Sequence, residues 1–350
     1  MGVPLTPIIK RKVISLSNLR GRTLAVDANN VLYQFLALIR KPDGSPLTDS
    51  EGRVTSHLVG LLFRTTRLMS EYGTRLAFVF DGKPPRLKRA ELEKRREVRA
   101  KALAQWKEAK ASGDYATAFS KAVASSKLSL QMSEDAKRLL SLLGVPQIQA
   151  PSDAEAQAAL MVARGDAWAV ASQDYDSLLY GAPRLVRHVT LTGREFLPSK
   201  GESRRLLPEL IDLQSVLDGL NLSRESLVDL ALLVGTDFND GVLGVGPKTA
   251  LKFMRQYGSI EAIPSNVLPR PPGDLDSLRK AFLDPEVVRD YRLEFGDMDE
   301  EGVVSFLCKE REFSPQRVDE AVKRLKSVRA RRSALTKWMD SSGQKPRPFR

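Results

Sequence analysis

The sequence predicts a single α/β domain with a mainly parallel central sheet and helices on both faces. Short apolar runs alternate with longer amphipathic stretches, which is typical of parallel strands joined by crossover helices. The chain has 350 residues, of which 42% are hydrophobic and 28% charged, so it can bury a full core. Its apolar runs fall short of the ~20 residues that span a bilayer. We therefore expect neither an integral membrane protein nor a mainly disordered chain.

The expected elements follow in order along the chain. The apolar runs predict buried strands at Thr23–Ala28, Leu76–Asp81, Pro146–Gln149 and Ala167–Ala171. Apolar residues at helical spacing predict helices at Val31–Arg40, Val54–Tyr72, Ser133–Leu143 and Ala154–Arg164. In open parallel sheets, ligands bind where the carboxyl ends of the strands meet, so we expect a site at that edge.

Positive charge indicates a polyanionic partner. The chain carries 55 Lys and Arg residues against 43 Asp and Glu residues, a net charge of +12. Nucleic-acid-binding proteins share this excess with ribosomal and membrane-surface proteins. The excess is concentrated in residues 82–131, with 13 basic and five acidic residues, and again after residue 320. Residues 82–131 favour helices with little apolar surface, so we expect them to face phosphates; an ordinary solvated face is the alternative.

Acidic residues gather where the expected strands end. Each follows an apolar run or opens a helix, and together they are Asp27, Asp81, Asp153, Glu155, Asp174, Asp176 and Asp237. A single acid in such a place is usually a helix cap or a turn residue. Seven acids from separate segments would repel one another strongly unless cations lay between them. The sequence therefore predicts a metal site at this edge.

The ligand types narrow the metal and the chemistry. Carboxylate oxygens suit Mg²⁺ or Mn²⁺ better than Zn²⁺. His57 and His188 are the two histidines of the chain, which disfavours histidine-based catalysis, and no Ser/His/Asp motif occurs. A carboxylate-rich site in a basic protein indicates phosphodiester hydrolysis, in which two cations ~3.5–4 Å apart activate water and stabilise the leaving oxygen.

Five segments, in order along nearly the whole chain, resemble the flap endonucleases, structure-specific 5′ nucleases of the XPG/Rad2-like superfamily. They are AVDANNVLYQFL (25–36), FVFDGKPPRLKRAELEKR (78–95), APSDAEAQAAL (150–160), SQDYDSLLYG (172–181) and VGTDFNDGVLGVGPKTA (234–250). The resemblance implies a PIN-like nuclease fold in one domain, residues 1–331, followed by a tail, residues 332–350. Within that domain it implies an N-terminal nuclease region (1–98), a helical arch (82–131), and an internal nuclease region (132–258) that ends in a helix–hairpin–helix (223–258).

The resemblance also implies two Mg²⁺ ions per active site, for which Mn²⁺ can substitute. One ion would be surrounded by Asp27, Asp81, Asp153 and Glu155, and the second by Asp174, Asp176 and Asp237. The family pattern has Glu where Asp153 stands, and Asp is one methylene shorter. Coordination by Asp153 through a water is therefore an alternative to direct coordination.

Further roles follow from matching positions. Lys88 and Arg95 are two helical turns apart, share one face, and would act on the scissile phosphate; ordinary helix charge is the alternative. Tyr33 would stack on a base, although packing of its helix is the commoner role of an aromatic residue.

The glycine-rich turn before residue 250 would grip the duplex. Gly244, Gly246 and Lys248 lie where a hairpin enters a helix, and helix N-termini bind phosphate. In the family this loop also holds a monovalent ion, K⁺. In the tail, Leu335, Trp338 and Met339 have the spacing of a sliding-clamp-binding motif, although its initial Gln is replaced; packing on the body is the alternative.

The implied activity is removal of 5′ flaps at single-strand/duplex junctions, with 5′-3′ exonuclease activity, in Okazaki-fragment maturation and long-patch base excision repair. Alternatives are a related bubble or resection nuclease, a non-catalytic junction-binding scaffold, and a metal-dependent RNase. We expect a monomer. The lone Cys308 and the lack of a secretory leader favour an intracellular protein, cytoplasmic if archaeal and nuclear if eukaryotic, and the short tail favours an archaeal source.

Overall fold

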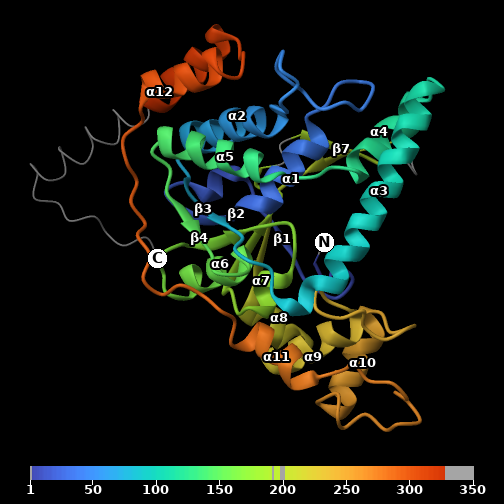
Figure 1. Ribbon diagram of the computed structural model, residues 1–350. Helices are drawn as coiled ribbons and strands as arrows, with labels where there is room; N and C mark the ends of the chain where they lie inside the picture. The colour runs from blue at the N-terminus through green and yellow to red at the C-terminus, as the bar shows by residue number, and fades with distance from the viewer. Residues whose placement is uncertain (1, 191–192, 198–201, 328–350) are drawn as a thin grey trace, which may run out of the picture.

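The computed structural model describes residues 2–190, 193–197 and 202–327, and its centre is a seven-stranded sheet (Figure 1). The strand order is β1-β9-β6-β5-β2-β3-β4. The strands are β1 (Lys12–Val13), β2 (Thr23–Asp27), β3 (Arg75–Phe80), β4 (Gln147–Gln149), β5 (Ala169–Ala171), β6 (Arg184–Arg187) and β9 (Glu209–Asp212). Strands β6, β5, β2, β3 and β4 run parallel, whereas β9 and β1 complete one side in antiparallel register. The predicted mainly parallel α/β sheet is confirmed.

The four expected strands lie within two residues of their predicted bounds. Strands β1, β6 and β9 were not predicted. A separate two-stranded hairpin of β7 (Gly193–Leu197) and β8 (Glu202–Leu206) was also missed.

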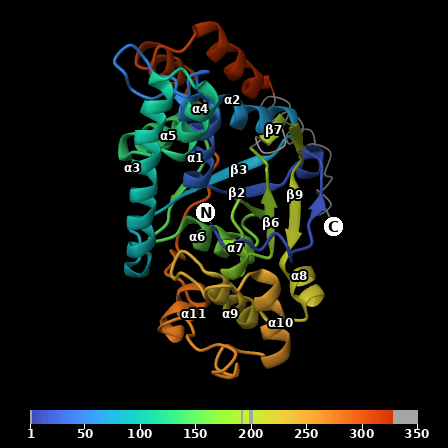
Figure 2. The same ribbon diagram turned by 90° about the vertical axis from the view of Figure 1, so that its right-hand side faces the viewer.

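Helices cover both faces of the sheet (Figures 1 and 2). They are α1 (Ala28–Leu38), α2 (Ser56–Glu71), α3 (Arg89–Ala111), α4 (Tyr115–Ala124), α5 (Leu130–Leu142), α6 (Ala154–Ala163), α7 (Asp176–Leu179), α8 (Leu213–Leu220), α9 (Arg224–Val234), α10 (Pro247–Tyr257), α11 (Leu275–Leu283) and α12 (Glu300–Val304). The first helix begins at residue 28 rather than at the predicted 31, because the Asp27 side chain accepts a hydrogen bond from the Asn30 backbone N–H and caps it.

The core is divided by the sheet into two apolar clusters. Successive residues of a strand point to opposite faces, so Ala25 belongs to one cluster while Leu24 and Val26 belong to the other. Helices α6 to α11 pack on the first face. Helices α1, α2, α5 and α12 pack on the second, together with a helical segment at residues 315–327.

The arch stands at the side of the sheet as a pair of helices, α3 and α4 (Figure 2). Of the 23 residues of α3, Ala102 and Ala109 are the ones that are buried, which agrees with the thin apolar stripe of the sequence. The outer end of the arch is held by the loop after α1, where Trp106 Nε1 donates to the Asp43 carbonyl oxygen at 3.2 Å and Lys110 pairs with the Asp43 carboxylate at 2.8 Å.

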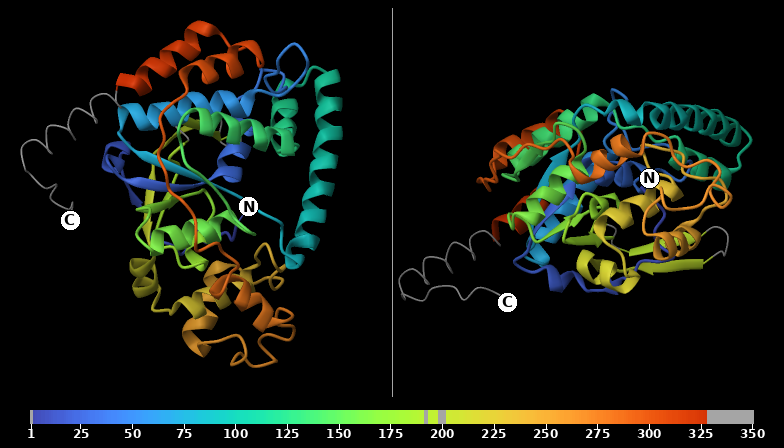
Figure 3. Two further views of the ribbon diagram at one scale, coloured as in Figure 1. Left: turned by 60° about the vertical axis from the view of Figure 1, so that its left-hand side comes forward. Right: turned by 90° about the horizontal axis from the view of Figure 1, so that it is seen from below.

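After α11 the chain returns to the opposite end of the molecule. Residues 284–299 run along the sheet to α12, the orange segment in the left view of Figure 3. Gln157 holds this segment through paired 2.8 Å hydrogen bonds to the backbone of Val288. In the ranges that the structure describes, no helix combines the length and apolar character needed to cross a membrane.

Candidate active site

The carboxyl ends of β2, β3 and β5 bring acids to one edge of the sheet, as predicted. We call this set of seven the carboxylate edge: Asp27, Asp81, Asp153, Glu155, Asp174, Asp176 and Asp237. Asp27 ends β2, Asp81 follows β3, and Asp176 begins α7 after β5. Each acid is fixed by neighbouring donors, so the edge is built by local chain geometry as well as by the sheet.

A glycine brings two segments of the edge together. A Cβ atom on Gly82 would lie 2.3 Å from the carbonyl oxygens of Ala150 and Pro151, so only glycine fits there. Its backbone N–H donates to the Ser152 carbonyl oxygen at 2.6 Å. One residue earlier, the Asp81 carboxylate accepts the Ala154 backbone N–H at 2.8 Å, which ties the end of β3 to the start of α6.

Asparagine and serine side chains hold further acids in place. Asn29 donates to Asp81 at 2.6 Å, and Asn30 donates to Asp174 at 2.9 Å. The Ser172 hydroxyl donates to Glu155 at 2.9 Å. The sequence reasoning did not assign roles to these three residues. A signal for the two asparagines was present, since Asn29 and Asn30 lie two and three residues after Asp27.

The N-terminal segment forms one wall of the edge. The Val3 backbone N–H donates to Asp176 at 2.9 Å. A Cβ atom on Gly2 would lie 2.5 Å from the same carboxylate and 2.8 Å from the Asp174 Cβ. The absence of a side chain at residue 2 thus allows the chain to pass directly beside two of the predicted metal ligands.

Cations from the base of the arch reach down to the edge. Lys88 Nζ lies 2.7 Å from Asp153 and 3.5 Å from Asp237, and Arg95 pairs with Asp237. The second oxygen of Asp153 accepts the Tyr180 hydroxyl at 2.6 Å, so both of its oxygens are engaged. Asp153 begins α6 but makes no capping hydrogen bond, so its side chain serves these partners instead.

Burial and mutual repulsion dominate the electrostatics of the edge. Burial, reinforced by Asp81 and Asp174, raises the pKa of Asp27 well above its usual value. Burial together with Asp237 and Asp174 raises the pKa of Asp176 to about 7. Burial lowers the pKa of Lys88, but the carboxylates of Asp153, Asp237 and Asp81 raise it by more. The acids are therefore poorly compensated wherever the arch cations do not reach.

The edge suits a divalent cation by its chemistry. All of its donors are oxygens, which divalent cations such as Mg²⁺ prefer. Burial raises the pKa of Glu155, and the nearby carboxylates of Asp176, Asp27 and Asp174 raise it further, so acids of both predicted ligand groups lie close together. Among residues 2–190, 193–197 and 202–327, however, no group of three or more acids is already arranged to hold an ion. One oxygen of Asp153 is instead bound by Lys88, and one oxygen of Asp237 by Arg95.

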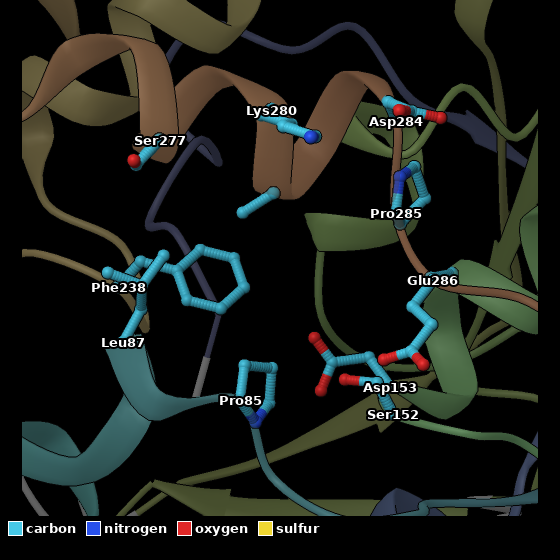
Figure 4. A pocket seen from close by; sticks show the side chains of 12 residues that line it. Pro85, Leu87, Ser152, Asp153, Phe238, Ser277, Lys280, Asp284, Pro285 and Glu286 are labelled. Carbon is cyan, nitrogen blue, oxygen red and sulfur yellow. The ribbon is translucent and has the colours of Figure 1, made fainter.

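A cavity of about 250 Å³ opens beside Asp153 (Figure 4). Pro85 and Leu87 at the base of the arch line one side, and the ring of Phe238 faces its centre. Lys88 Nζ lies 5.3 Å from the Phe238 ring centroid, so this wall also supports the cation at the edge.

The remaining predicted site residues that the structure describes lie on α1 and around the start of α10. The Tyr33 hydroxyl accepts from Arg99 of the arch at 3.2 Å. Gly244, with a φ of +80°, is exposed in the loop between α9 and α10, and Gly246 and the exposed Lys248 lie at the start of α10. The predicted clamp motif of Leu335, Trp338 and Met339, within the tail 332–350, falls outside the described residues.

Comparison with known proteins agrees with this geometry. Two family models match: the XPG N-terminal domain over residues 1–102 and the XPG I-region over residues 144–237. The flap endonuclease 1 of Pyrococcus horikoshii is 49% identical over 341 residues, covering 97% of this chain and 98% of that protein. The chain belongs to the flap endonuclease family. Its predicted membership, and with it the enzyme class of a nuclease that hydrolyses phosphodiesters, is confirmed.

Solved structures place this flap endonuclease in the same fold. The flap endonuclease-1 from Methanococcus jannaschii superposes with a TM-score of 0.74 at 38% identity, covering 95% of this chain and 100% of that one. The catalytic core of Rad2, solved in complex with a DNA substrate, has a TM-score of 0.69 at 23% identity and shares the fold over 92% of this chain and 97% of its own. Flap endonucleases are structure-specific, divalent-metal-dependent nucleases of DNA replication and repair, and the chain is a member of that class.

Proposed function

We propose that this flap endonuclease cuts 5′ flaps where single strand meets duplex, with the scissile phosphate between the carboxylate edge and the base of the arch. One observation carries the proposal: Lys88 and Arg95 extend from the arch onto Asp153 and Asp237. A phosphate bound between these partners would meet cations on one side and the acids of the carboxylate edge on the other.

The acids have complementary roles in this proposal. Two Mg²⁺ ions, or Mn²⁺ in their place, would be held by the two predicted groups, Asp27, Asp81, Asp153 and Glu155 and then Asp174, Asp176 and Asp237. Bound there, such ions would supply an activated water and neutralise charge on the leaving oxygen. The side chains of Asn29 and Asn30 would keep their acids oriented, since each already donates to one carboxylate oxygen.

Lys88 and Arg95 would act on the substrate itself. Both are partly enclosed, with 18% and 30% of the side chain exposed, so their charge is weakly screened. Moving from a carboxylate to the non-bridging oxygens of the scissile phosphate would let them stabilise charge that develops during hydrolysis. Their present pairing keeps them positioned directly over the edge.

The rest of the molecule would hold the junction. The loop that contains Gly244 and Gly246, with Lys248 at the start of α10, would bind the duplex backbone, because the backbone N–H groups of a helix N-terminus favour phosphate. Backbone oxygens of the same loop would hold a K⁺ ion. Tyr33, tied to the arch through Arg99, would stack on a base next to the cut. The same site would remove nucleotides from 5′ ends as an exonuclease.

We further propose a monomeric, cytoplasmic enzyme of Okazaki-fragment maturation and long-patch base excision repair. The flap endonucleases of archaea such as Pyrococcus horikoshii and Methanosarcina barkeri are its relatives. A sliding clamp would recruit it through Leu335, Trp338 and Met339. The proposed cleavage does not depend on that contact, because every residue assigned to the edge and to the arch lies before the tail.

Single-turnover cleavage of a labelled flap tests the role of Lys88. Lys88→Ala should slow the cleavage step by about a hundredfold, the usual cost of losing one group that stabilises transition-state charge, while flap affinity changes little. Lys94→Ala is the matched control: it lies on the same arch, but its partner is the exposed Asp240. A Lys88→Ala defect confined to affinity, or equal to that of Lys94→Ala, would contradict the proposed role.

A further inference from the structure

Of the predicted metal ligands, Asp174 lies on a short irregular segment, residues 172–175, between β5 and α7, and Asp176 is the first residue of α7. One side of this segment is held by Asn30, which accepts the Gln173 backbone N–H at 3.3 Å and donates to Asp174 at 2.9 Å. The Ser172 hydroxyl accepts the Asp174 backbone N–H at 3.2 Å. Mutual repulsion pushes Asp174 and Asp176 apart, so the opposite side of the segment also needs support.

Arg187, at the end of β6, provides that support. Its Nε donates to the Gln173 carbonyl oxygen at 2.8 Å, and its Nη1 donates to the Tyr175 hydroxyl at 2.6 Å. The guanidinium also lies 4.5 Å from the centroid of the Tyr175 ring. One planar group thus fixes the residues on both sides of Asp174, without touching that carboxylate.

Arg187 is itself held firmly. Its side chain is 14% exposed, and Nη1 lies 3.2 Å from Glu209 on β9, which also pairs with Arg11. Tyr175 is 3% exposed, and its hydroxyl lies 3.1 Å from the Thr6 hydroxyl of the N-terminal segment. The support therefore runs from the antiparallel side of the sheet into the metal-binding segment.

We infer that Arg187 is a positioning residue for the divalent cation bound by Asp174 and Asp176, an inference that rests on the proposed metal site. A guanidinium offers several donors in a rigid plane, and Arg187 uses that plane to bind a carbonyl, a hydroxyl and a carboxylate. A lysine would keep the positive charge but has one compact ammonium group, so it cannot reproduce the three contacts.

The strand offers a matched control. Arg184, at the start of β6, donates its Nε to a backbone carbonyl, that of Trp168, at 2.8 Å and lies 5.5 Å from the Trp168 ring centroid. It shares the carbonyl and ring contacts of Arg187, but not the hydroxyl and carboxylate contacts, and it lies at the end of the strand away from the carboxylate edge. Arg184→Lys should therefore cost stability without changing metal affinity.

The test measures Mn²⁺ binding to the full-length protein by calorimetry, without DNA, and thermal unfolding in chelator. Arg187→Lys should weaken Mn²⁺ binding by about tenfold, the lower end of what outer partners of metal ligands contribute. Its flap cleavage should require a correspondingly higher Mg²⁺ concentration and recover near the wild-type maximum. Tyr175→Phe removes one of the contacts and should weaken binding by about threefold.

The outcomes separate two failures. Equal Mn²⁺ affinity in Arg187→Lys and Arg184→Lys would overturn the positioning role. If Arg187→Lys fails to fold, unchanged affinity in Tyr175→Phe would overturn it instead. Failure of the wild-type protein to bind Mn²⁺ would refute the proposed metal site itself.

Discussion

Two clusters of buried charge differ in how their charges are matched. On α5, Asp135 is 7% exposed and meets Arg311, 8% exposed, through hydrogen bonds of 2.9 to 3.1 Å. Beside this buried pair, at the surface, Arg138 binds Glu310 through two hydrogen bonds of 2.6 and 2.7 Å. We call this the matched cluster. At the carboxylate edge, by contrast, Asp27 and Asp176 are at least as buried but lie close to other acids.

This difference distinguishes ion pairs that are compatible with a stable fold from like charges that serve the reaction. A buried ion pair with complete hydrogen bonding can be maintained by the fold alone. Buried like charges cost stability, and a protein tolerates them where they serve chemistry. Substitutions in the two clusters should therefore move activity and stability in opposite ways.

The largest expected effect is on activity, at the edge. Asp176→Asn should lower flap cleavage by about a thousandfold or more, because a lost metal ligand removes several kcal/mol of transition-state stabilisation. Unfolding of the metal-free variant near pH 8 should show no loss of stability, since one of several repelling charges is gone. Single-turnover kinetics and denaturant unfolding measure both. A large loss of stability with intact cleavage would show that Asp176 serves the fold rather than the reaction.

The matched cluster should respond in the opposite way. Arg311→Met leaves Asp135 buried without its cation and should lower the free energy of unfolding by about 3–5 kcal/mol. Cleavage by the folded fraction at low temperature should stay near that of the wild type, because the cluster lies on the α2 and α5 face. Denaturant unfolding and cleavage rates per folded molecule are the measurements. A parallel loss of intrinsic cleavage would show that the clusters are coupled.

A smaller effect concerns pH. His57 is fully buried beside the matched cluster; burial, with a smaller contribution from Arg311, lowers its pKa to about 4, against the opposing influence of Asp135. Between pH 4 and pH 6.5 the His57 imidazole is therefore mostly protonated in the unfolded chain and mostly neutral in the folded protein. The contribution of neutral His57 to the free energy of unfolding is full above pH 6.5 and is lost as the pH falls towards 4. The loss approaches about 3 kcal/mol.

Replacing His57 with leucine sharpens this expectation. In His57→Leu, the free energy of unfolding should fall less between pH 7 and pH 4 than it does in the wild type. The difference between the two losses should approach about 3 kcal/mol. Identical pH profiles would mean that acidification opens the protein elsewhere, beginning with the carboxylates.

Sequence reasoning located the acids because its rules there are local. An apolar run followed by an acid places that acid at a strand's carboxyl end, and Asp27, Asp81 and Asp176 lie there. The same reasoning overlooked a second role of Asp27, the cap that starts α1 early. One carboxylate oxygen accepts the Asn30 N–H, a contact that the capping preference of Asp could have predicted.

The elements that were missed depend on distant partners. In β6, two apolar residues stand between Arg184 and Arg187, too short a run to stand out. Strand β1 pairs Lys12 with Leu210, almost 200 residues away. Likewise, no spacing rule could place Lys88 against Asp153, because that contact depends on where the base of the arch leaves the sheet.

The end of the described chain completes the second apolar cluster. Val318, Val322 and Leu325 of the helical segment at 315–327 are buried with the residues of α2 and α5. During synthesis these side chains leave the ribosome long after the helices that they cover. A growing chain therefore carries an uncovered apolar face, a kind of surface that favours aggregation, until nearly all of its described residues have been made.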